Sequence, residues 1–494
     1  MAMLVRPSQR LVIGLMSGTS ADGVDAALLS LTLPGSTACE AESYVPTRVG
    51  HIDGTRILAD GTAMKLLAYT TIPFPVALRA RIFTLREGSL ASKLFMHELC
   101  ELSATIATEY AAAAFSVAML AGISMASITA IGAHGLTVFH LPPLTLQLLD
   151  APLLASLTNC DVVHDMRRAD CAAGGQGAPL VPMADVLLWG ATCSGTSSPL
   201  VLVNVGGVAN ITVISGTRVI AFDTGPAMCI SDAIVRRAQI DAGYDDAGAM
   251  AAHGYVNANS VRAILSAGST YFNRAPPKSC DVPQLLSLFD SYVEVASNKP
   301  IRDLDSGDSQ SSSGAQFQPS ETEERQQLTT QRTILYLHDA LATALALTAE
   351  TLARGVIAGV TYCAAALPEN DSASDSPFVS TPTAARVVVS GGGAMNATLL
   401  EMLRIRLGIS GANESCNAVL SYSAAFPRPR DEPAALTFDI TDNDGIPSAA
   451  KEAVAWALLA DLSLARRAGN VPSCTGARSA VVLGSIALSP HPRC

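Results

Sequence analysis

The chain has 494 residues, more than one hydrophobic core usually serves, so we expect at least two domains. Apolar residues make up 49% and charged residues 15%, a composition typical of a folded globule and not of a disordered or fibrous chain. The formal net charge of −11 and the lack of any basic run argue against nucleic acids and anionic membranes as main partners.

The eleven cysteines are scattered and form no C-x-x-C pair, which indicates buried thiols in a reducing, cytoplasmic compartment. The N-terminal MAMLVRPSQR lacks the apolar core of a secretory signal. Residues 110–133 carry no charge and are long enough to span a bilayer, but they are weakly hydrophobic and interrupted by Gly122. We therefore interpret them as a buried helix followed by a short strand over 128–133.

A strand, a glycine-rich turn and a second strand occur once in each half of the chain. Residues 11–17 are apolar, GTSADG makes a tight turn, and residues 24–33 form a second strand. The same shape returns at 200–205, Gly206-Gly207 and 208–214, and a third strand over 219–222 ends at Asp223. This repetition predicts two related α/β domains that face each other.

Apolar spacing predicts helices over 90–117, 152–157, 182–189, 332–353, 398–407 and 449–464. The pure β run RVVVS, residues 386–390, leads directly into three glycines. Three polar or proline-rich segments are interpreted as surface insertions, looped or disordered, because they cannot contribute to a core; they cover 303–327, 369–382 and 410–433.

The first turn, residues 18–23, offers backbone amides and two hydroxyl groups that could surround phosphate oxygens. The Asp22 carboxylate could hold a magnesium ion, usually through water. An ordinary hairpin, in which Asp-Gly supplies the required positive φ, explains the same residues, so this segment alone leaves both interpretations open.

Two further glycine motifs follow strands. Gly206-Gly207 occupies the corresponding turn of the second repeat, with Asp223-Thr224-Gly225-Pro226 at the end of the next strand. Gly391-Gly392-Gly393 lies between a strand and a helix, where glycines allow a flat group such as adenine to approach. Together these turns favour a nucleotide in an interdomain cleft. The P-loop, protein-kinase and dinucleotide fingerprints do not occur in the sequence.

Asp170 follows Arg167 and Arg168 and precedes the turn-forming GGQGAP, so it is a candidate for a positioned base. A surface ion pair is the simpler interpretation of the same residues. His134 and His140 flank GLTVF, but a six-residue spacing does not fit a metal pair on one helix face. A structural role is the simpler reading of His140.

The chain resembles the anhydro-N-acetylmuramic acid kinases of the actin–hexokinase–acetate kinase superfamily. Matching blocks run in family order from residue 11 to residue 483 and are interrupted only at the expected insertions. The blocks are LVIGLMSGTSADGVDAALL, GAHGLTVFH, TLQLLDAPLLA, RRADCAAGGQGAPLVP, VNVGGVANIT, FDTGPAMCISDA, APPKS, LTAETLA, VVSGGGAMNATLL, GIPSAAKEAVAWALLA and GNVPSCTGA.

The resemblance implies an α/β fold of two actin-like, ribonuclease H-like domains with ATP and Mg²⁺ in the cleft between them. We expect the first domain to cover 1–140 plus about 446–494, and the second 141–445. The implied activity opens 1,6-anhydro-N-acetylmuramic acid with water and phosphorylates O6, giving N-acetylmuramic acid 6-phosphate. Alternatives are a kinase of levoglucosan or of another anhydrosugar, and a non-catalytic ATP-binding switch. Family members are commonly homodimers, and the domains are expected to close around ligand.

The resemblance also implies residue roles. Asp170 corresponds to the base that deprotonates the attacking water, and Asp22 lies near the metal. The sugar is expected near His134, Thr137, Arg168 and Glu350. The residues implied to bind ATP and its phosphates are Gly18, Thr19, Ser20, Asp22, Gly23, Asp25, Asn204, Gly206, Gly207, Asn210, Asp223, Gly225, Gly391, Gly392, Gly393 and Asn396.

Four positions depart from the family pattern, all toward apolar or bulkier side chains. Leu136 stands where the family usually has Gln, Leu149 where it has Gly, and Ala227-Met228 where it has Gly-Asn. We expect these changes near the sugar, because the phosphate and base motifs are intact. They leave the identity of the anhydrosugar open.

Overall fold

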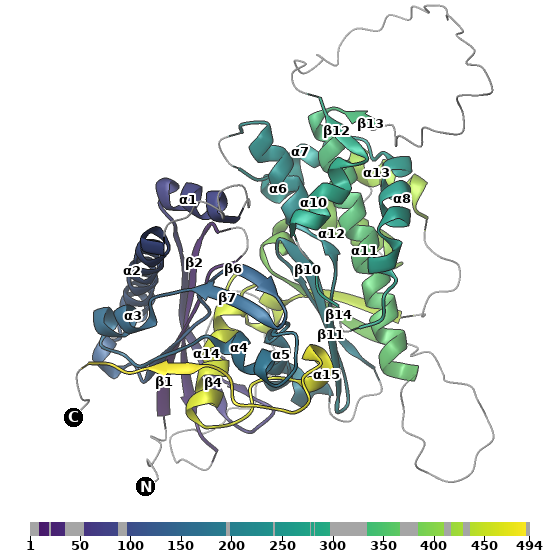
Figure 1. Ribbon diagram of the computed structural model, residues 1–494. Coiled ribbons are helices and arrows are strands. Elements are labelled where there is room, and N and C mark those ends of the chain that lie inside the picture. The colour runs from purple at the N-terminus through teal and green to yellow at the C-terminus, as the bar shows by residue number, and fades with distance from the viewer. Residues whose placement is uncertain are drawn as a thin grey trace, which may run out of the picture.

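Strands and helices alternate through the computed structural model, which has an α/β fold (Figure 1). Thr19, Ser20 and the expected insertions at 303–327 and 369–382 lie outside the described residues. The structure describes residues 9–18, 21–34, 54–86, 96–193, 198–240, 243–276, 278–280, 282–296, 333–365, 384–409, 416–427 and 435–490.

The first sheet has the strand order β16-β8-β5-β1-β2-β4-β3. Strands β1, β2 and β4 form an antiparallel meander, and β5 and β8 run parallel to β1. Its strands are β1 Gln9–Met16, β2 Gly23–Thr32, β3 Arg56–Ile57, β4 Ala63–Pro73, β5 Ala130–Ala133, β8 Val162–His164 and β16 Ser485–Ala487.

The second sheet has the order β11-β10-β9-β14-β15, with an antiparallel meander followed by two parallel strands. When the two-residue β3 is left out, the strands β4-β2-β1-β5-β8 of the first sheet and β11-β10-β9-β14-β15 of the second both have the order third, second, first, fourth, fifth along the chain, which confirms the predicted pair of related α/β domains. The turns β1–β2 and β9–β10 therefore occupy equivalent places. The strands are β9 Leu200–Val205, β10 Val208–Ser215, β11 Arg218–Pro226, β14 Ala384–Ser390 and β15 Ala435–Ile440.

Three long helices cover the sheets. Helix α2, Met96–Leu120, packs on β2 and β4, and α11, Leu337–Ala365, packs on β10 and β11. Helix α14, Lys451–Leu464, packs on β1, β2 and β5. Within the described residues, α2 and most of α11 are long and apolar enough to cross a membrane, but α11 is almost wholly buried inside the second domain.

The remaining elements are short. The other helices are α1 Val76–Arg86, α3 Ala151–Thr158, α4 Met166–Ala172, α5 Val181–Cys193, α6 Met228–Arg237, α7 Ala249–Ala252, α8 Ala258–Ala267, α9 Ser269–Phe272, α10 Val282–Asp290, α12 Ala397–Arg406, α13 Asn417–Ala425 and α15 Pro472–Thr475. The 3-10 helices are η1 Met125–Ser127, η2 Asp246–Gly248, η3 Gly392–Met395 and η4 Thr441–Asp444. Two small sheets pair β6 Leu136–Leu141 with β7 Leu144–Leu148, and β12 Val293–Val295 with β13 Thr333–Leu335.

The structure corrects the expectation that 410–433 is only a loop or disordered. Residues 417–425 form α13, because an apolar face of Ala418, Val419 and Tyr422 packs into the core beside α12. The helix expected over 332–353 also differs, since a short strand, β13, comes first and α11 continues to residue 365. The helix and strand expected over 110–133 are confirmed, with Gly122 at φ +67° between them.

Strand pairing also moves the domain boundary expected at residue 140. Helix α3 packs on α2, and β8 pairs in parallel with β5, so the chain stays with the first sheet at least to His164. A parallel pair needs a crossover connection, and α3 supplies it here. At the other end α14 packs on the first sheet and β16 pairs with β8, which agrees with the placement of 446–494 in that domain.

Helices α5 and α14 join the two halves. One buried cluster contains side chains of both sheets, such as Val12 and Leu202, together with residues of α5 and α14. Inside it, Lys451 Nζ lies 3.1 Å from Asp185 Oδ1, and the two side chains are 3% and 1% exposed. Figure 1 shows the C-terminal α14, in yellow, lying in the same half of the molecule as β1 and β2. This shared core positions the two glycine turns relative to each other.

Candidate active site

The turn between β1 and β2 is tight and closely packed. The Gly18 carbonyl accepts the Ala21 N–H at 3.1 Å, and Ala21 has φ +50°. A Cβ on Gly23 would lie 2.2 Å from the Ile72 carbonyl oxygen, so only glycine fits beside β4. Asp22 stays exposed at the tip of the turn, where its carboxylate accepts from Arg79 at 2.6 Å.

The equivalent turn between β9 and β10 is bound to the start of α6. The Gly206 carbonyl accepts the Met228 N–H, and the Gly207 carbonyl accepts the Ala227 and Cys229 N–H groups, at 3.0–3.1 Å. These α6 amides are therefore occupied and do not face a phosphate. A Cβ on Gly206 would have its nearest contact at 3.6 Å, so the backbone on that side of the turn is open.

The third glycine motif lies directly against the second. Gly391 has φ +86°, and a Cβ there would be 2.6 Å from Asn204 Oδ1 and 2.7 Å from the Val205 carbonyl oxygen. Because β14 pairs with β9, the ends of the two strands meet at this point. Gly392 has no heavy atom within 4 Å of an added Cβ, which leaves its backbone accessible.

Two asparagines of these motifs have clear local roles. Asn204 donates from Nδ2 to Glu452 Oε1 at 2.8 Å, while its Oδ1 is buried without a donor among the described residues. Asn210 lies opposite Asn204 in the β9–β10 pair. Asn396 caps α12, since its Oδ1 accepts the Leu399 N–H at 2.9 Å, and it is only 5% exposed. A cap of this kind positions the chain after the glycines and leaves one amide group for other partners.

Several carboxylates of both domains influence one another around the turns. Burial raises the pKa of Asp25 to about 6; the Thr71 hydroxyl opposes this shift, and the negative charges of Glu452 and Asp22 add to it. Burial raises the pKa of Asp232, on α6, to about 7, and Asp22 of the other domain raises it further. This excess of negative charge fits a bound cation.

The described residues contain no group of three His, Cys, Asp or Glu side chains close enough to hold a metal by themselves. A magnesium ion here would therefore keep water and phosphate oxygens as most of its ligands, as Mg²⁺ commonly does. Asp22 and Asp25 are the side chains placed to contribute, directly or through water.

Arg167 and His134 form a buried pair. Arg167 donates from Nε to His134 Nε2 at 2.8 Å and from Nη1 to the Gly177 carbonyl at 2.9 Å. The His134 ring lies 4.2 Å from the Trp456 ring, and burial together with Arg167 holds the pKa of His134 well below its usual value. The imidazole is therefore neutral, and its Nε2 is the accepting nitrogen.

The two neighbouring arginines point in different directions. Arg168 points to the surface with its side chain 66% exposed and pairs with Asp165, three residues earlier. Arg167 instead points inward to His134 and Gly177, where burial lowers its pKa and the charges of Glu452 and Asp223 oppose that shift. Successive residues of a helix point in different directions, and no local pattern distinguishes the two.

Asp170 is wholly buried and its carboxylate accepts three hydrogen bonds. Oδ1 accepts from Asn470 Nδ2 and from the Thr475 hydroxyl, and Oδ2 accepts the Gly177 N–H, each at 2.7 Å. A Cβ on Gly175 would be 2.1 Å from Oδ2. The carboxylate thus ties the glycine loop to the C-terminal segment. Oδ2 accepts one hydrogen bond and keeps a lone pair, so the expected role of Asp170 as base stays a prediction.

Asp223 has the environment that a base requires. It is half-buried in β11, and its Oδ2 accepts the Cys280 N–H at 2.8 Å, while its Oδ1 has no donor among the described residues. Burial raises the pKa of Asp223 to about 6, against the opposing effects of the Cys280 N–H, Arg167 and Lys278. A carboxylate with one available oxygen and a pKa near neutrality can accept a proton.

Glu350 is held inside the second domain. It is 1% exposed on α11 and accepts from Arg406 at 2.7 Å and from the Tyr422 hydroxyl at 2.9 Å. Its expected place near the sugar stays a prediction. Gly225 is also a packing residue, because a Cβ there would be 2.9 Å from the Thr351 side chain. The sequence pattern could not separate these roles from binding roles.

The positions that depart from the family pattern are mostly packed. Leu136 is fully buried in the first-domain core, and Ala227 is 1% exposed. Leu149 packs beside the same first-domain core. Met228 Sδ lies 4.0 Å from Asn396 Nδ2 at the start of α6. Thr137, in the β6–β7 hairpin, accepts from Gln147 Nε2 at 3.4 Å.

Sequence reasoning missed Glu452, Arg167 and Asp232. Glu452 is in the first turn of α14, which brings it to Asn204 from the far end of the chain. A carboxylate at the start of an otherwise apolar helix was the only local signal for it. Asp232 lies on α6, in the segment that follows FDTGP. Only the approach of the two domains places it near Asp22.

Comparison with known proteins shows the family to which the chain belongs. The model of the family "Anhydro-N-acetylmuramic acid kinase" matches residues 47–288 and 431–489, more than half of the chain. Proteins with that name from Bordetella pertussis and Cupriavidus pinatubonensis are 33% and 32% identical; the alignments cover 97% and 96% of this chain and 96% and 97% of theirs.

Among solved structures, a ROK family glucokinase from Streptomyces griseus aligns over 91% of this chain and 98% of its own, with 12% identity and a TM-score of 0.33. That score is too low to support a conclusion about this protein. The family model and the full-length similarity to the bacterial relatives are sufficient by themselves. The chain therefore belongs to the anhydro-N-acetylmuramic acid kinase family.

Proposed function

We propose that this protein is an ATP-dependent kinase that opens 1,6-anhydro-N-acetylmuramic acid with water and phosphorylates its O6. The product is N-acetylmuramic acid 6-phosphate. Membership of the family supports the reaction. One observation supports its assignment to the glycine turns and the carboxylates beside them. The glycine turns of two equivalent domains lie beside carboxylates whose pKa values are raised by burial and, to a smaller extent, by their mutual repulsion.

The residues present fit ATP and Mg²⁺. The open backbones at Gly206 and Gly392 leave space for phosphate and nucleoside groups. Burial is the main reason for the raised pKa of Asp25, and a divalent cation beside Asp22 and Asp25 would offset the smaller effect of the neighbouring negative charges. When bound, ATP supplies the γ-phosphoryl group that O6 takes up, and Mg²⁺ balances the charge of the phosphates.

The chain's own residues must activate water and hold the sugar. Water attacks the anomeric carbon and gives its proton to a carboxylate, while the bond between C1 and O6 breaks. O6 bonds to the γ-phosphorus as the bond between that phosphorus and the oxygen of the leaving ADP breaks. We assign that proton to Asp223 Oδ1, which has no donor among the described residues. Arg167 and neutral His134 lie on the side of the first domain and are placed to contact sugar hydroxyl groups.

The assignment of the base is tested with two variants. Asp223→Asn should bind ATP normally and lose turnover by about 10²–10⁴-fold, the usual contribution of a general base. Asp170→Asn should lower Tm, because its buried carboxylate accepts three hydrogen bonds, and should keep measurable turnover where it stays folded. Normal turnover in Asp223→Asn together with loss in a stably folded Asp170→Asn would restore Asp170 as the base.

The substrate is tested by ADP release in the presence of MgATP and either 1,6-anhydro-N-acetylmuramic acid or levoglucosan. Turnover of the first sugar supports the proposal. Turnover of levoglucosan alone would mean that residues around Met228 have changed the sugar pocket. Binding of ATP without turnover of either sugar would favour a non-catalytic switch.

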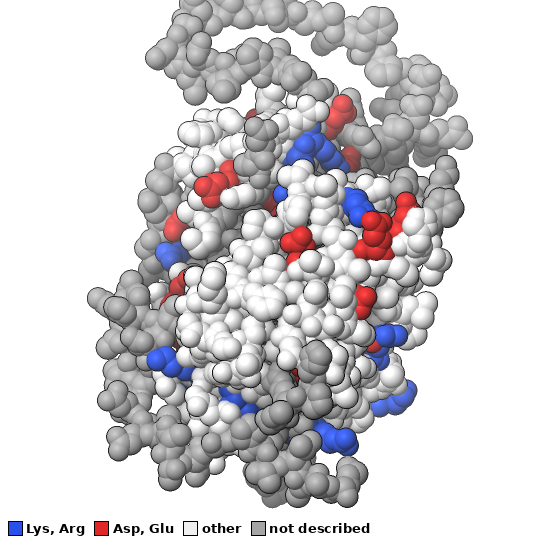
Figure 2. Space-filling model, turned by 90° about the vertical axis from the view of Figure 1, so that its left-hand side faces the viewer, with Lys and Arg blue, Asp and Glu red and all other residues white. Residues whose placement is uncertain are grey.

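We also propose that the enzyme acts in the cytoplasm as a homodimer. The face of α2 supports association, since Phe115, Met119 and Leu120 are 46%, 75% and 60% exposed. Figure 2 shows few charged side chains on that side of the molecule. Light scattering after gel filtration should give twice the monomer mass.

We also expect the two domains to close around ligand. Small-angle scattering with a non-hydrolysable ATP analogue should therefore show a smaller radius of gyration than without it.

A further inference from the structure

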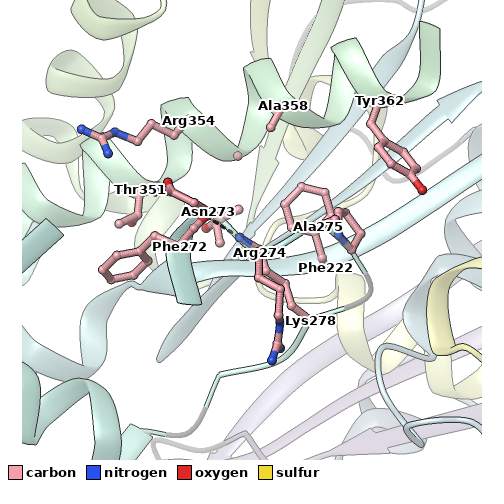
Figure 3. Close-up of a pocket in the computed structure, with 13 residues that line it drawn as sticks. Phe222, Phe272, Asn273, Arg274, Ala275, Lys278, Thr351, Arg354, Ala358 and Tyr362 are labelled. Atoms are coloured by element: carbon pink, nitrogen blue, oxygen red, sulfur yellow. Dashed lines mark hydrogen bonds between the residues drawn. The ribbon is translucent and has the colours of Figure 1, made fainter. Parts of the chain in front are cut away.

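A cavity of about 360 Å³ lies in the second domain, between β11, the segment after α9 and helix α11. Figure 3 shows Arg354, Ala358 and Tyr362 along α11, with Phe222 and Lys278 on the other elements. Phe222 and Thr224 line the cavity, and successive residues of a strand face opposite ways, so Asp223 faces the other side of β11. The cavity is therefore separate from the site described above. Its volume is in the range of small-molecule sites.

Positive charge predominates in the lining of this cavity. Arg274, Lys278 and Arg354 line it, and none of the described lining residues is acidic. Lys278 is 8% exposed; its Nζ donates to the Phe272 carbonyl at 2.8 Å, which Figure 3 marks with a dashed line. Burial and the nearby Arg274 lower the pKa of Lys278. The cost of holding these cations together favours an anionic occupant.

The charge of Arg354 is only weakly balanced. Its nearest acid is Glu350, whose Oε2 lies 3.7 Å from Arg354 Nε, and the same carboxylate is shared with Arg406 and the Tyr422 hydroxyl, which both donate to Oε1. Arg274 has no carboxylate partner among the described residues and lies over the Tyr271 ring instead, 5.6 Å from its centroid. Both guanidinium groups are exposed and can turn toward a ligand.

The rest of the lining is suited to a ring. Phe222, Phe272 and Tyr362 supply aromatic side chains, and Tyr362 is 47% exposed. Thr351 and Asn273 add polar groups at the wall. Aromatic faces with a few polar groups and cations match a molecule that combines an apolar ring face, hydroxyl groups and an anion, which is the chemistry of a sugar phosphate.

The segment that forms one wall of the cavity also holds Asp223. The Asp223 N–H donates to the Lys278 carbonyl at 3.0 Å, the Tyr271 hydroxyl donates to the Asp223 carbonyl at 3.0 Å, and the Cys280 N–H donates to Asp223 Oδ2 at 2.8 Å. Any ligand that moves Lys278 or its neighbours therefore changes the position of the Asp223 carboxylate.

We propose that this cavity binds the phosphate monoester of a small sugar and that its occupation lowers turnover by displacing Asp223. The product of the proposed reaction belongs to this chemical class, so the effect on turnover rests on the proposed function. Binding to the cavity does not rest on it. The arrangement would slow the enzyme when phosphorylated sugar accumulates.

Binding is tested by calorimetry with inorganic phosphate, glucose 6-phosphate and N-acetylmuramic acid 6-phosphate. Ala358→Glu places a negative charge in the lining at an exposed position of α11, and Thr361→Glu adds the same charge at an exposed position outside the lining. We expect the sugar phosphates to bind the wild type, and Ala358→Glu to weaken them at least about tenfold. Thr361→Glu should change the affinity by less than about twofold.

Two results would overturn the site. Equal affinity of wild type and Ala358→Glu would place the sugar phosphates elsewhere, and affinity for inorganic phosphate equal to that for the esters would remove the sugar from the ligand class. Both results are affinities and need no turnover, so they test the site even if the proposed kinase activity is absent.

Inhibition tests the link to Asp223. At saturating anhydrosugar, added N-acetylmuramic acid 6-phosphate should lower kcat of the wild type and of Thr361→Glu, and this effect should disappear in Ala358→Glu. Inhibition that is purely competitive with the anhydrosugar and equal in all three proteins would overturn the regulatory role, because it would place the inhibitor in the active site.

Discussion

Replacing Lys451 with methionine should destabilise the protein strongly, because it leaves a buried carboxylate without its cation. Lys451 Nζ and Asp185 Oδ1 are 3.1 Å apart, and their side chains are 3% and 1% exposed. The Thr212 hydroxyl donates to the second oxygen of Asp185 at 2.8 Å and is the only other polar support that the carboxylate has among the described residues.

The expected loss of stability in Lys451→Met follows from the burial of this ion pair. Removing one partner of a buried ion pair typically costs about 3–5 kcal/mol. For domains of this size a loss of 1 kcal/mol lowers Tm by about 2–4 °C, so Lys451→Met should lower Tm by about 10 °C. Replacing both charges, in Asp185→Leu/Lys451→Met, should recover most of the loss, since an apolar pair of similar volume often replaces a buried ion pair at little cost.

Differential scanning calorimetry of the wild type, both single variants and the double variant tests this reasoning. Both single variants should unfold at lower temperature than the double variant. A Tm of Lys451→Met within about 2 °C of the wild type would refute it, because the ion pair would then contribute no more than a surface pair. A double variant that is less stable than either single variant would also contradict it.

Three further predictions concern the site and the second domain. Because burial raises the pKa of Asp223 to about 6, it is protonated below that pH, and kcat/KM should fall about tenfold per pH unit there; a flat profile from pH 5 to 8 would contradict its role. Gly391→Ala should lower Tm and ATP affinity, since φ is +86° and β9 crowds the Cβ, whereas Gly392→Ala, in open space, should change Tm little. Tyr422→Phe should cost about 1–3 kcal/mol of stability by removing a donor to buried Glu350, with kcat unchanged; a fall in kcat would place Glu350 at the site.

Much of the fold could be predicted because its signals are local. Apolar runs and glycine turns indicate a strand, turn and strand in each half, and the two sheets share the order of five strands. Helix α13 was missed because only three of its residues enter the core, and the surrounding composition is that of a loop. The place of β8 in the first sheet could not be predicted, because its pairing with β5 is a long-range contact with no local signature.

The roles of individual side chains were harder to predict than the motifs. Asp170 and Asp223 both follow recognisable motifs, yet one is enclosed by three donors and the other keeps an available oxygen. Arg167 and Arg168 are neighbours in sequence and differ only in the direction that α4 gives them. Such differences depend on contacts with distant segments, here the residues around Asn470 and Cys280.

The sequence by itself determined the family, the repeated α/β topology and the glycine turns, because backbone conformation and apolar periodicity are properties of neighbouring residues. Only the tertiary structure decided which polar groups meet. It brings Glu452 to Asn204, Asp22 toward Asp232, and the Tyr271–Cys280 segment to Asp223. The physical reason is that hydrogen bonding, burial and charge act through space, so a side chain acquires its pKa and its partners only when the two domains have packed around α5 and α14.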